Sequence, residues 1–201
     1  MTKFFTLLLA SAILSLTAVS QTKNTNQIGV SAGLNFATVT TSAYTNSDYR
    51  TGFNLGISLD HFFSESWSIK GKLAYDQKGW KGYLATPTDQ FNTTYNLDYL
   101  TIPVMANWHF GRTKNWYLNF GPYVGILLNA KETSNGSDVK NIFNTTDAGL
   151  DVGIGIKFPI SEKAKFFIEI NGQGGIADIV KDNTYSALRN SVSNLNIGLN
   201  F

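Results

Sequence analysis

The chain has 201 residues, of which 15% are charged, and its 16 Lys and Arg residues nearly balance its 14 Asp and Glu residues. A net charge of +2 gives no basic surface of the kind that nucleic acid requires, so no nucleic-acid partner is expected. The chain has no cysteine, which excludes a disulfide framework, a thiolate metal site and a lipidated N-terminal cysteine.

The first 20 residues have the features of a signal peptide. Lys3 provides a short basic start, an apolar run covers 4–19, and small residues precede Gln21. The run is short for a transmembrane helix, which needs about 20 residues. We therefore expect cleavage between Ser20 and Gln21 and a single mature domain over 21–201. The alternative is an uncleaved membrane anchor.

Beyond residue 20, apolar and polar residues alternate in eight segments, and no long apolar run remains. A period of two is the pattern of a β-strand with one apolar and one polar face. The many glycine and aromatic residues, 18 Gly, 14 Phe, 9 Tyr and 4 Trp, also favour strands. The segments cover 28–36, 52–60, 67–78, 99–110, 116–128, 147–158, 166–173 and 195–201.

The connections between these segments are alternately long and short. The short ones cover 63–66, 111–115 and 159–164, and the long, polar ones cover 40–50, 81–94, 129–145 and 177–190. An even number of strands with short turns at one end and long loops at the other is typical of outer-membrane barrels. The predicted fold is therefore all-β, an eight-stranded antiparallel up-and-down transmembrane β-barrel. Its turns are expected in the periplasm and its loops outside the cell.

The last segment is expected to close the barrel, because a barrel in lipid can leave no free strand edge. Its apolar face is formed by Leu195, Ile197, Leu199 and Phe201. We expect it to pair antiparallel with the first segment, which places Phe201 at the same end as Ile28. The alternative is a soluble lipocalin-like barrel or sandwich, which would expose its glycines and lysines to water.

Aromatic residues gather near both ends of the strands, as expected for rings at the two membrane interfaces. The group at the short-turn end comprises Phe62, Phe63, Trp67, Trp108, Phe110, Trp116, Phe158, Phe166 and Phe201. The group at the long-loop end comprises Phe36, Phe53, Tyr75, Trp80, Tyr95 and Tyr99. Pro103 and Pro122 lie within neighbouring segments, where each removes a backbone donor, so a shared β-bulge is expected there.

Three features resemble the PorT-like outer-membrane β-barrel family. They are the signal peptide, the Tyr-Leu-Thr-Ile-Pro stretch at 99–103 and the final strand that ends in phenylalanine. The resemblance implies a small eight-stranded barrel in the bacterial outer membrane. Some members of this family are tied to protein secretion across that membrane, and the family offers no catalytic residues to transfer.

Charged residues on the polar faces are expected to form a network in the lumen. The set comprises Asp60, Lys70, Lys72, Asp76, Lys78, Asp147, Asp151, Lys157 and Glu169. Eight strands enclose an interior just wide enough for side chains, and unpaired charges there would be costly. We therefore expect a sealed, salt-bridged plug, in which Lys70 lies diagonal to Asp60 and Lys157 lies diagonal to Glu169.

Candidate catalytic groups are few. His61 and His109 both fall at the short-turn end, whereas a lipid A-modifying barrel needs a general base near the outer leaflet. Asp147 and Asp151 are four residues apart on one strand, too far apart to share a proton or to hold calcium together. We expect no enzymatic activity, no cofactor and no metal.

The expected function is a structural or binding role through the extracellular loops or through envelope partners. Loops 129–145 and 177–190 carry mixed charge, which suits a protein or glycan better than a polyanion. The expected partners are outer-membrane lipid and other envelope or extracellular proteins or glycans, and the barrel is expected to be monomeric. Alternatives are a secretion-accessory role, a small porin-like pore for passive transport, and, least favoured, a lipid A-modifying enzyme.

Overall fold

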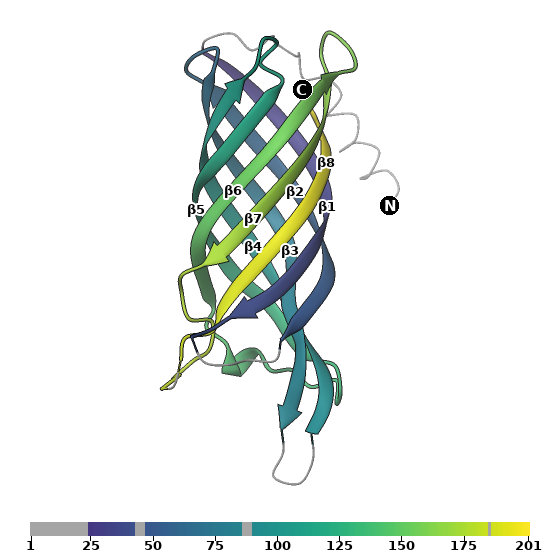
Figure 1. Cartoon of the computed structure of the whole chain (residues 1–201), viewed down its shortest axis with the longest axis vertical. Helices are drawn as coiled ribbons and strands as arrows, with labels where there is room; N and C mark the ends of the chain where they lie inside the picture. The colour runs from purple at the N-terminus through teal and green to yellow at the C-terminus, as the bar shows by residue number, and fades with distance from the viewer. Residues whose placement is uncertain (1–23, 43–46, 86–89, 185) are drawn as a thin grey trace, which may run out of the picture.

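The computed structural model describes residues 24–42, 47–85, 90–184 and 186–201. Within these residues the chain forms eight antiparallel strands that pair in sequence order and close into a barrel (Figure 1). The predicted fold class is confirmed, while the expected signal peptide, with Ser20 and Gln21, lies outside the described residues. The elements are β1 (Thr25–Thr40), β2 (Asp48–Phe62), β3 (Trp67–Ala85), β4 (Gln90–Phe110), β5 (Trp116–Glu132), the short 3₁₀ helix η1 (Lys140–Ile142), β6 (Thr146–Pro159), β7 (Lys165–Gly175) and β8 (Arg189–Asn200).

Strands β1 and β8 close the barrel as the sequence predicts. Their register runs from Gly29 opposite Asn200 to Thr40 opposite Arg189. Just beyond β8, the backbone N–H of Phe201 donates to the carbonyl oxygen of Ile28 at 2.8 Å, and the Ile28 N–H donates back to Phe201 at 3.1 Å. No strand edge is left free along this seam.

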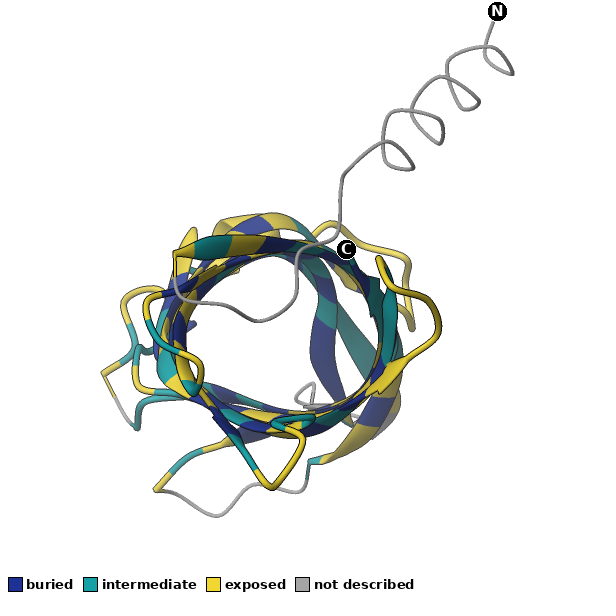
Figure 2. Ribbon diagram, turned by 90° about the horizontal axis from the view of Figure 1, so that it is seen from above, coloured by how far each residue is buried: buried dark blue, intermediate teal, exposed yellow. Residues whose placement is uncertain are grey.

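The barrel wall has an apolar outer face and a polar inner face. On β2, Leu55 and Ile57 point outward and are 52% and 57% exposed, whereas Asn54 and Asp60 point inward and are at most 2% exposed. Figure 2 shows this alternation of buried and exposed residues along the strands. None of the helices in the described part of the chain is long and apolar enough to cross a membrane.

Strands β3 and β4 extend farther than the sequence predicts. Their hairpin includes much of the segment 81–94, which was expected to be a loop because it is polar. The hairpin projects beyond the other strands at the long-loop end (Figure 1). The Thr-Thr-Tyr run at 93–95 has the β-propensity for this extension. Gly79 has a φ of +120°, and a Cβ there would lie 1.9 Å from the carbonyl oxygen of Tyr95. Only glycine therefore permits the two strands to approach so closely.

The expected bulge at the two prolines is wrong. The β4–β5 register is the same before and after them, with Pro103 opposite Tyr123 and Ala106 opposite Phe120. A Cβ at Gly121 would lie 2.1 Å from the carbonyl oxygen of Val104, so the missing side chain lets the strands stay close without an extra residue. The irregularities lie elsewhere, beside Asp98 in β4–β5 and between 49 and 54 in β2–β3.

An apolar cluster fills the long-loop end of the interior. Its buried members are Val39, Trp80, Leu97, Tyr99, Leu127 and Ala130 from the strands, with Phe143 and Ile179 from the loops. Trp80, Tyr95 and Tyr99, expected at the outer interface, therefore contribute to the interior. They share the strand face of inward residues such as Lys78 and Thr101. Phe62 at the other end also points inward and is only 1% exposed.

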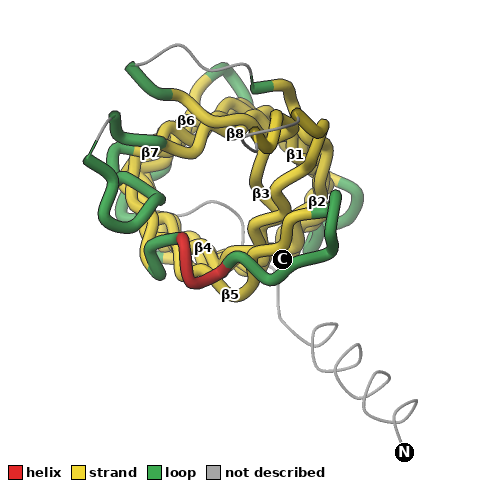
Figure 3. Tube along the Cα trace, turned by 90° about the horizontal axis from the view of Figure 1, so that it is seen from below, coloured by secondary structure: helices red, strands yellow, loops and turns green. Residues whose placement is uncertain are grey.

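Loops 129–145 and 177–190 are tied to each other above this cluster. Phe143 and Val180 form an antiparallel β-bridge. The backbone N–H of Asn144 donates to Ile179 at 2.8 Å, and that of Lys181 donates to Ile142 at 2.9 Å. Figure 3 shows η1 at the rim beside β4 and β5, with the loops arranged around the mouth. The two loops are thus held to each other by backbone hydrogen bonds and form part of the folded structure.

Candidate functional site

The predicted lumen residues lie inside the barrel. Lys72 is half-buried, and the other eight are at most 5% exposed. These eight are Asp60, Lys70, Asp76, Lys78, Asp147, Asp151, Lys157 and Glu169. They share the interior with buried asparagines, tyrosines and phenylalanines from most of the strands.

Among the residues that the structure describes, three ion pairs cross the lumen between strands that are not neighbours. Lys70 of β3 lies 3.4 Å from Glu169 of β7. Lys78 of β3 lies 3.2 Å from Asp147 of β6. A third pair of opposite charges links Lys157 of β6 to Asp60 of β2 at 3.9 Å, and Lys157 also donates to the side chain of Gln27 at 2.7 Å.

The partners differ from those expected. Lys70 lies directly opposite Asp60 in the β2–β3 register instead of diagonal to it, and its ammonium pairs with Glu169. Lys157 is diagonal to Glu169, because it lies opposite Phe167, but it pairs with Asp60. In an eight-stranded barrel, long side chains from opposite walls meet in the middle. Strand adjacency alone therefore does not choose the partner.

Each of these three lysines also lies against two aromatic rings, none of which was expected in the lumen. Lys78 Nζ is 4.5 Å from the ring centre of Tyr123 and 5.1 Å from that of Tyr99. The corresponding rings are Tyr117 and Phe167 for Lys70, and Tyr117 and Phe62 for Lys157. Ring faces attract cations when water is excluded, so they stabilise buried ammonium groups. The inward position of these rings on the alternating strands was the signal available in the sequence.

The lumen carboxylates are also held by amide groups. Asn119 donates to Glu169 at 2.8 Å, Asn107 donates to Asp60 at 2.8 Å, and Asn190 donates to Asp147 at 2.9 Å. Asp151 accepts hydrogen bonds from Asn171 and Gln173, and Asp76 accepts one from Asn35. Hydrogen bonds of this kind are what a buried charge needs in order to remain in an interior.

The histidines lack the arrangement of a catalytic site. His109 Nε2 lies 3.3 Å from Ser68 Oγ, but both residues are 0% exposed, packed beside Phe62 and Tyr117. His61 is exposed, and its Nδ1 lies 2.7 Å from Asn26 Oδ1. Among the described residues, no three His, Asp or Glu side chains gather as a metal site would require.

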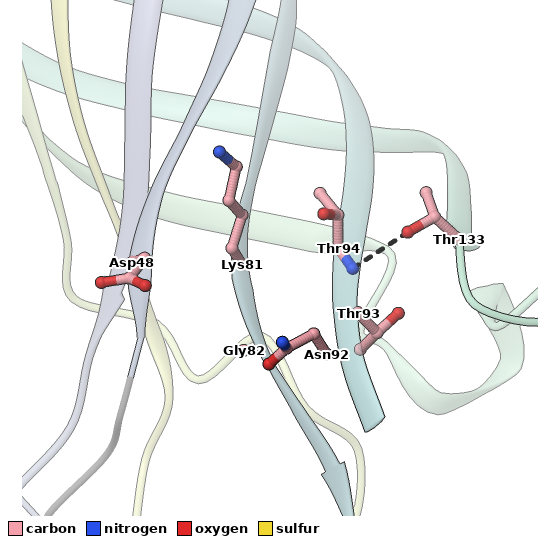
Figure 4. Close-up of a pocket in the computed structure, with 7 residues that line it drawn as sticks. All are labelled: Asp48, Lys81, Gly82, Asn92, Thr93, Thr94 and Thr133. Carbon is pink, nitrogen blue, oxygen red and sulfur yellow. Dashed lines mark hydrogen bonds between the residues drawn. The ribbon is translucent and has the colours of Figure 1, made fainter. Parts of the chain in front are cut away.

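A polar pocket of about 330 Å³ lies on the wall at the base of the β3–β4 hairpin (Figure 4). It is lined by Asp48 of β2, Lys81 and Gly82 of β3, Asn92, Thr93 and Thr94 of β4, and Thr133 after β5. The sequence did not predict this site, because all seven residues fall in segments that were assigned to loops, 40–50, 81–94 and 129–145. The Thr-rich stretch beside Asn92 is the signal that could have placed them on a strand.

Residues 19–181 match the family model described as outer membrane protein beta-barrel domain. The chain belongs to this outer-membrane β-barrel family. It is therefore an outer-membrane barrel, and its apolar outer face is the surface that meets lipid. No curated protein sequence matches the chain.

The solved structures that share the fold of this outer-membrane barrel include two bacterial surface proteins. OprG from Pseudomonas aeruginosa has a TM-score of 0.57 and 13% identity, and the match covers 90% of this chain and 98% of OprG. Neisserial surface protein A has a TM-score of 0.53 and 17% identity, with 86% and 95% of the two chains covered. At these identities the likeness describes the fold alone.

Proposed function

We propose that this barrel is a non-enzymatic binding protein that acts at its extracellular face, with the long-loop end outside the cell. The observation that carries the proposal is the closed interior. Ion pairs cross the lumen, and Phe143 and Ile179 pack into its long-loop end. At the long-loop end, the accessible polar surface is then the set of loops and the wall pocket, and binding groups concentrate on loops held by a rigid scaffold.

The enzymatic alternative is disfavoured by burial. Ser68 and His109 are close enough to form a hydrogen bond, but a substrate reaches neither of them because both are 0% exposed. The resemblance to the PorT-like family favours a variant of the main proposal, in which the bound partner belongs to a secretion system. A monomeric barrel with outer-membrane lipid around it is part of the same proposal.

A small pore is the second candidate function, favoured by the polar lining of the lumen. A conductance measurement in planar bilayers distinguishes the pore from the binding protein. Because the lumen is filled, we expect no steady open state. A steady current would replace the binding proposal with the pore.

Partner contacts are tested by cysteine crosslinking in intact cells. The chain has no cysteine of its own, so every crosslink comes from the cysteine that is introduced. Asn135→Cys places the probe on an exposed loop, and Arg112→Cys places a matched probe on an exposed short turn. We expect specific crosslinked products from Asn135→Cys and none from Arg112→Cys. The reverse result would move the function to the periplasmic rim.

A further inference from the structure

The wall pocket lies above the lipid. On β4 and β5 the outward apolar residues end at Leu100 and Leu128. The next outward residues are polar, and Asn129 donates to Asp98 across these strands at 3.3 Å. Thr94 lies four residues beyond Asp98. A barrel strand rises about 3.3 Å per residue and tilts by roughly 40°, so the pocket stands about 10 Å above Asp98, the first polar outward residue of β4. A headgroup layer is about 5–8 Å thick, so the pocket lies beyond the headgroups, on the outer side in the proposed orientation.

The pocket is built on the outward face of the hairpin. Lys81 pairs with Thr94 in the β3–β4 register, and both continue the outward faces of their strands, as does Asn92. Lys81 and Asn92 are exposed. In Figure 4, Asn92 lies beside Gly82, whose missing side chain leaves only backbone there. The pocket is thus beside the barrel and not over its mouth, so its occupant is a molecule that stands next to the wall.

The chemistry of the lining selects the class of occupant. It offers one carboxylate from Asp48, one ammonium from Lys81, one amide from Asn92 and the hydroxyls of Thr94 and Thr133, whereas the Thr93 hydroxyl is turned to Glu132. An apolar ligand would require a mainly apolar lining, and a polyanion would require a basic cluster. Neighbouring donors and acceptors without a dominant charge match the hydroxyl groups of a saccharide.

We propose that this pocket binds the oligosaccharide of an outer-leaflet glycolipid. The inference rests on the proposed function and names the ligand class of the extracellular face. A volume of about 330 Å³ is at the small end of the range for ligand sites, so the pocket holds a few sugar rings of a longer chain.

The walls of the pocket are fixed before any ligand arrives. The Thr94 N–H donates to the Thr133 hydroxyl at 3.0 Å, and the Thr133 N–H donates to the Thr94 carbonyl at 3.1 Å. Behind them, the carboxylate of Glu132, 3% exposed, accepts hydrogen bonds from the Thr93 hydroxyl and from the backbone N–H groups of Ser134 and Asn135. Glu132 does not line the pocket and acts as a positioning residue. A prearranged site loses less entropy on binding, which favours affinity for a flexible sugar.

The test uses the full-length mature barrel in lipid nanodiscs. The probe is the core oligosaccharide released by mild acid from the lipopolysaccharide of the producing bacterium, and its affinity is measured by calorimetry and saturation-transfer NMR. Asp48→Asn and Asn92→Ala are expected to weaken binding at least fivefold. The matched control is Lys131→Gln, an exposed lysine on the same side of the wall outside the pocket, which should bind like the parent. Heat-modifiable migration checks that each variant is folded.

Three outcomes would overturn the inference. The first is binding of intact lipopolysaccharide that both pocket variants retain, since the lipid part would then hold the ligand. The second is equal binding of maltose, a free disaccharide unrelated to the glycolipid, which would overturn the glycolipid as the source. The third is that no sugar binds while Asn135→Cys still gives crosslinked partners. That result would rule out the sugar site and leave the proposed function in place.

Discussion

Lys78 and Asp147 form a buried ion pair whose two side chains are fully enclosed. Tyr99 and Tyr123 lie against the ammonium, while Tyr123 and Asn190 hydrogen bond to the carboxylate at 3.2 and 2.9 Å. Removing one partner of such a pair leaves a charge that has lost both water and its counter-ion, whereas removing both leaves none. The pair therefore fixes how β3 and β6 face each other across the lumen more than it adds net stability.

We predict that the effects of substituting Lys78 and Asp147 on the free energy of unfolding are strongly coupled. Lys78→Met should lower the free energy of unfolding by about 3–5 kcal/mol, and Lys78→Met with Asp147→Asn should cost less than Lys78→Met alone. Urea unfolding in lipid vesicles measures both variants, with Lys181→Met as an exposed control expected within about 0.5 kcal/mol of the parent. A double variant that lowers the free energy of unfolding as much as Lys78→Met alone, or more, would contradict the coupling.

Strands and loops differ in how well the sequence predicts them. Alternation predicts that each of the eight strands exists and predicts most of the inward charges, because each strand has one face toward lipid and one toward the lumen. It misses the buried Arg50 and Glu132, which lie in strand ends that were assigned to loops. It cannot choose among partners that meet across a lumen, which is why the Lys70 and Lys157 pairs differ from those expected. It also cannot show which polar loops fold inward. The isolated Phe143 in a polar loop was the available signal, and its burial depends on Trp80 and Tyr95, far away in sequence.

The loop cluster predicts a local effect of Phe143. Phe143 is 3% exposed and meets the rings of Trp80 and Tyr95 edge-on, whereas its neighbour Ile142 is 48% exposed. Phe143→Ala should leave the barrel folded but release the two loops, because a buried Phe→Ala change in a core costs about 3–5 kcal/mol. Limited trypsin digestion should then cut after Lys140 or Lys181 at least tenfold faster, since cleavage follows the open population. Ile142→Ala is the matched control, and equal rates for the two variants would show that the cluster does not hold the loops.

On the scale of the whole molecule, closure makes the binding surface possible. The β1–β8 seam completes the wall, and the wall then supports the hairpin and loops as rigid extensions. The sequence predicts this closure from the physical need to satisfy every backbone group in lipid. It does not predict the register of the seam, because a shift of two residues would keep each apolar side chain on the same face.

That register predicts which cysteine pair can form a disulfide. Ala32 lies directly opposite Ile197 on the outer face, and directly opposed residues have Cα atoms about 4.5–5.5 Å apart, within disulfide range. Ala32→Cys with Ile197→Cys should therefore crosslink under a lipid-soluble oxidant. Ala32→Cys with Leu199→Cys is the matched control, since Leu199 lies opposite Val30, one diagonal step away and about 7–8 Å apart. The crosslinked chain is a closed ring, so after boiling it should migrate faster in denaturing gels than its reduced form. A disulfide in the control pair and none in the first would mean that β8 is shifted by two residues, and the wall beside the seam would need a different set of inward side chains.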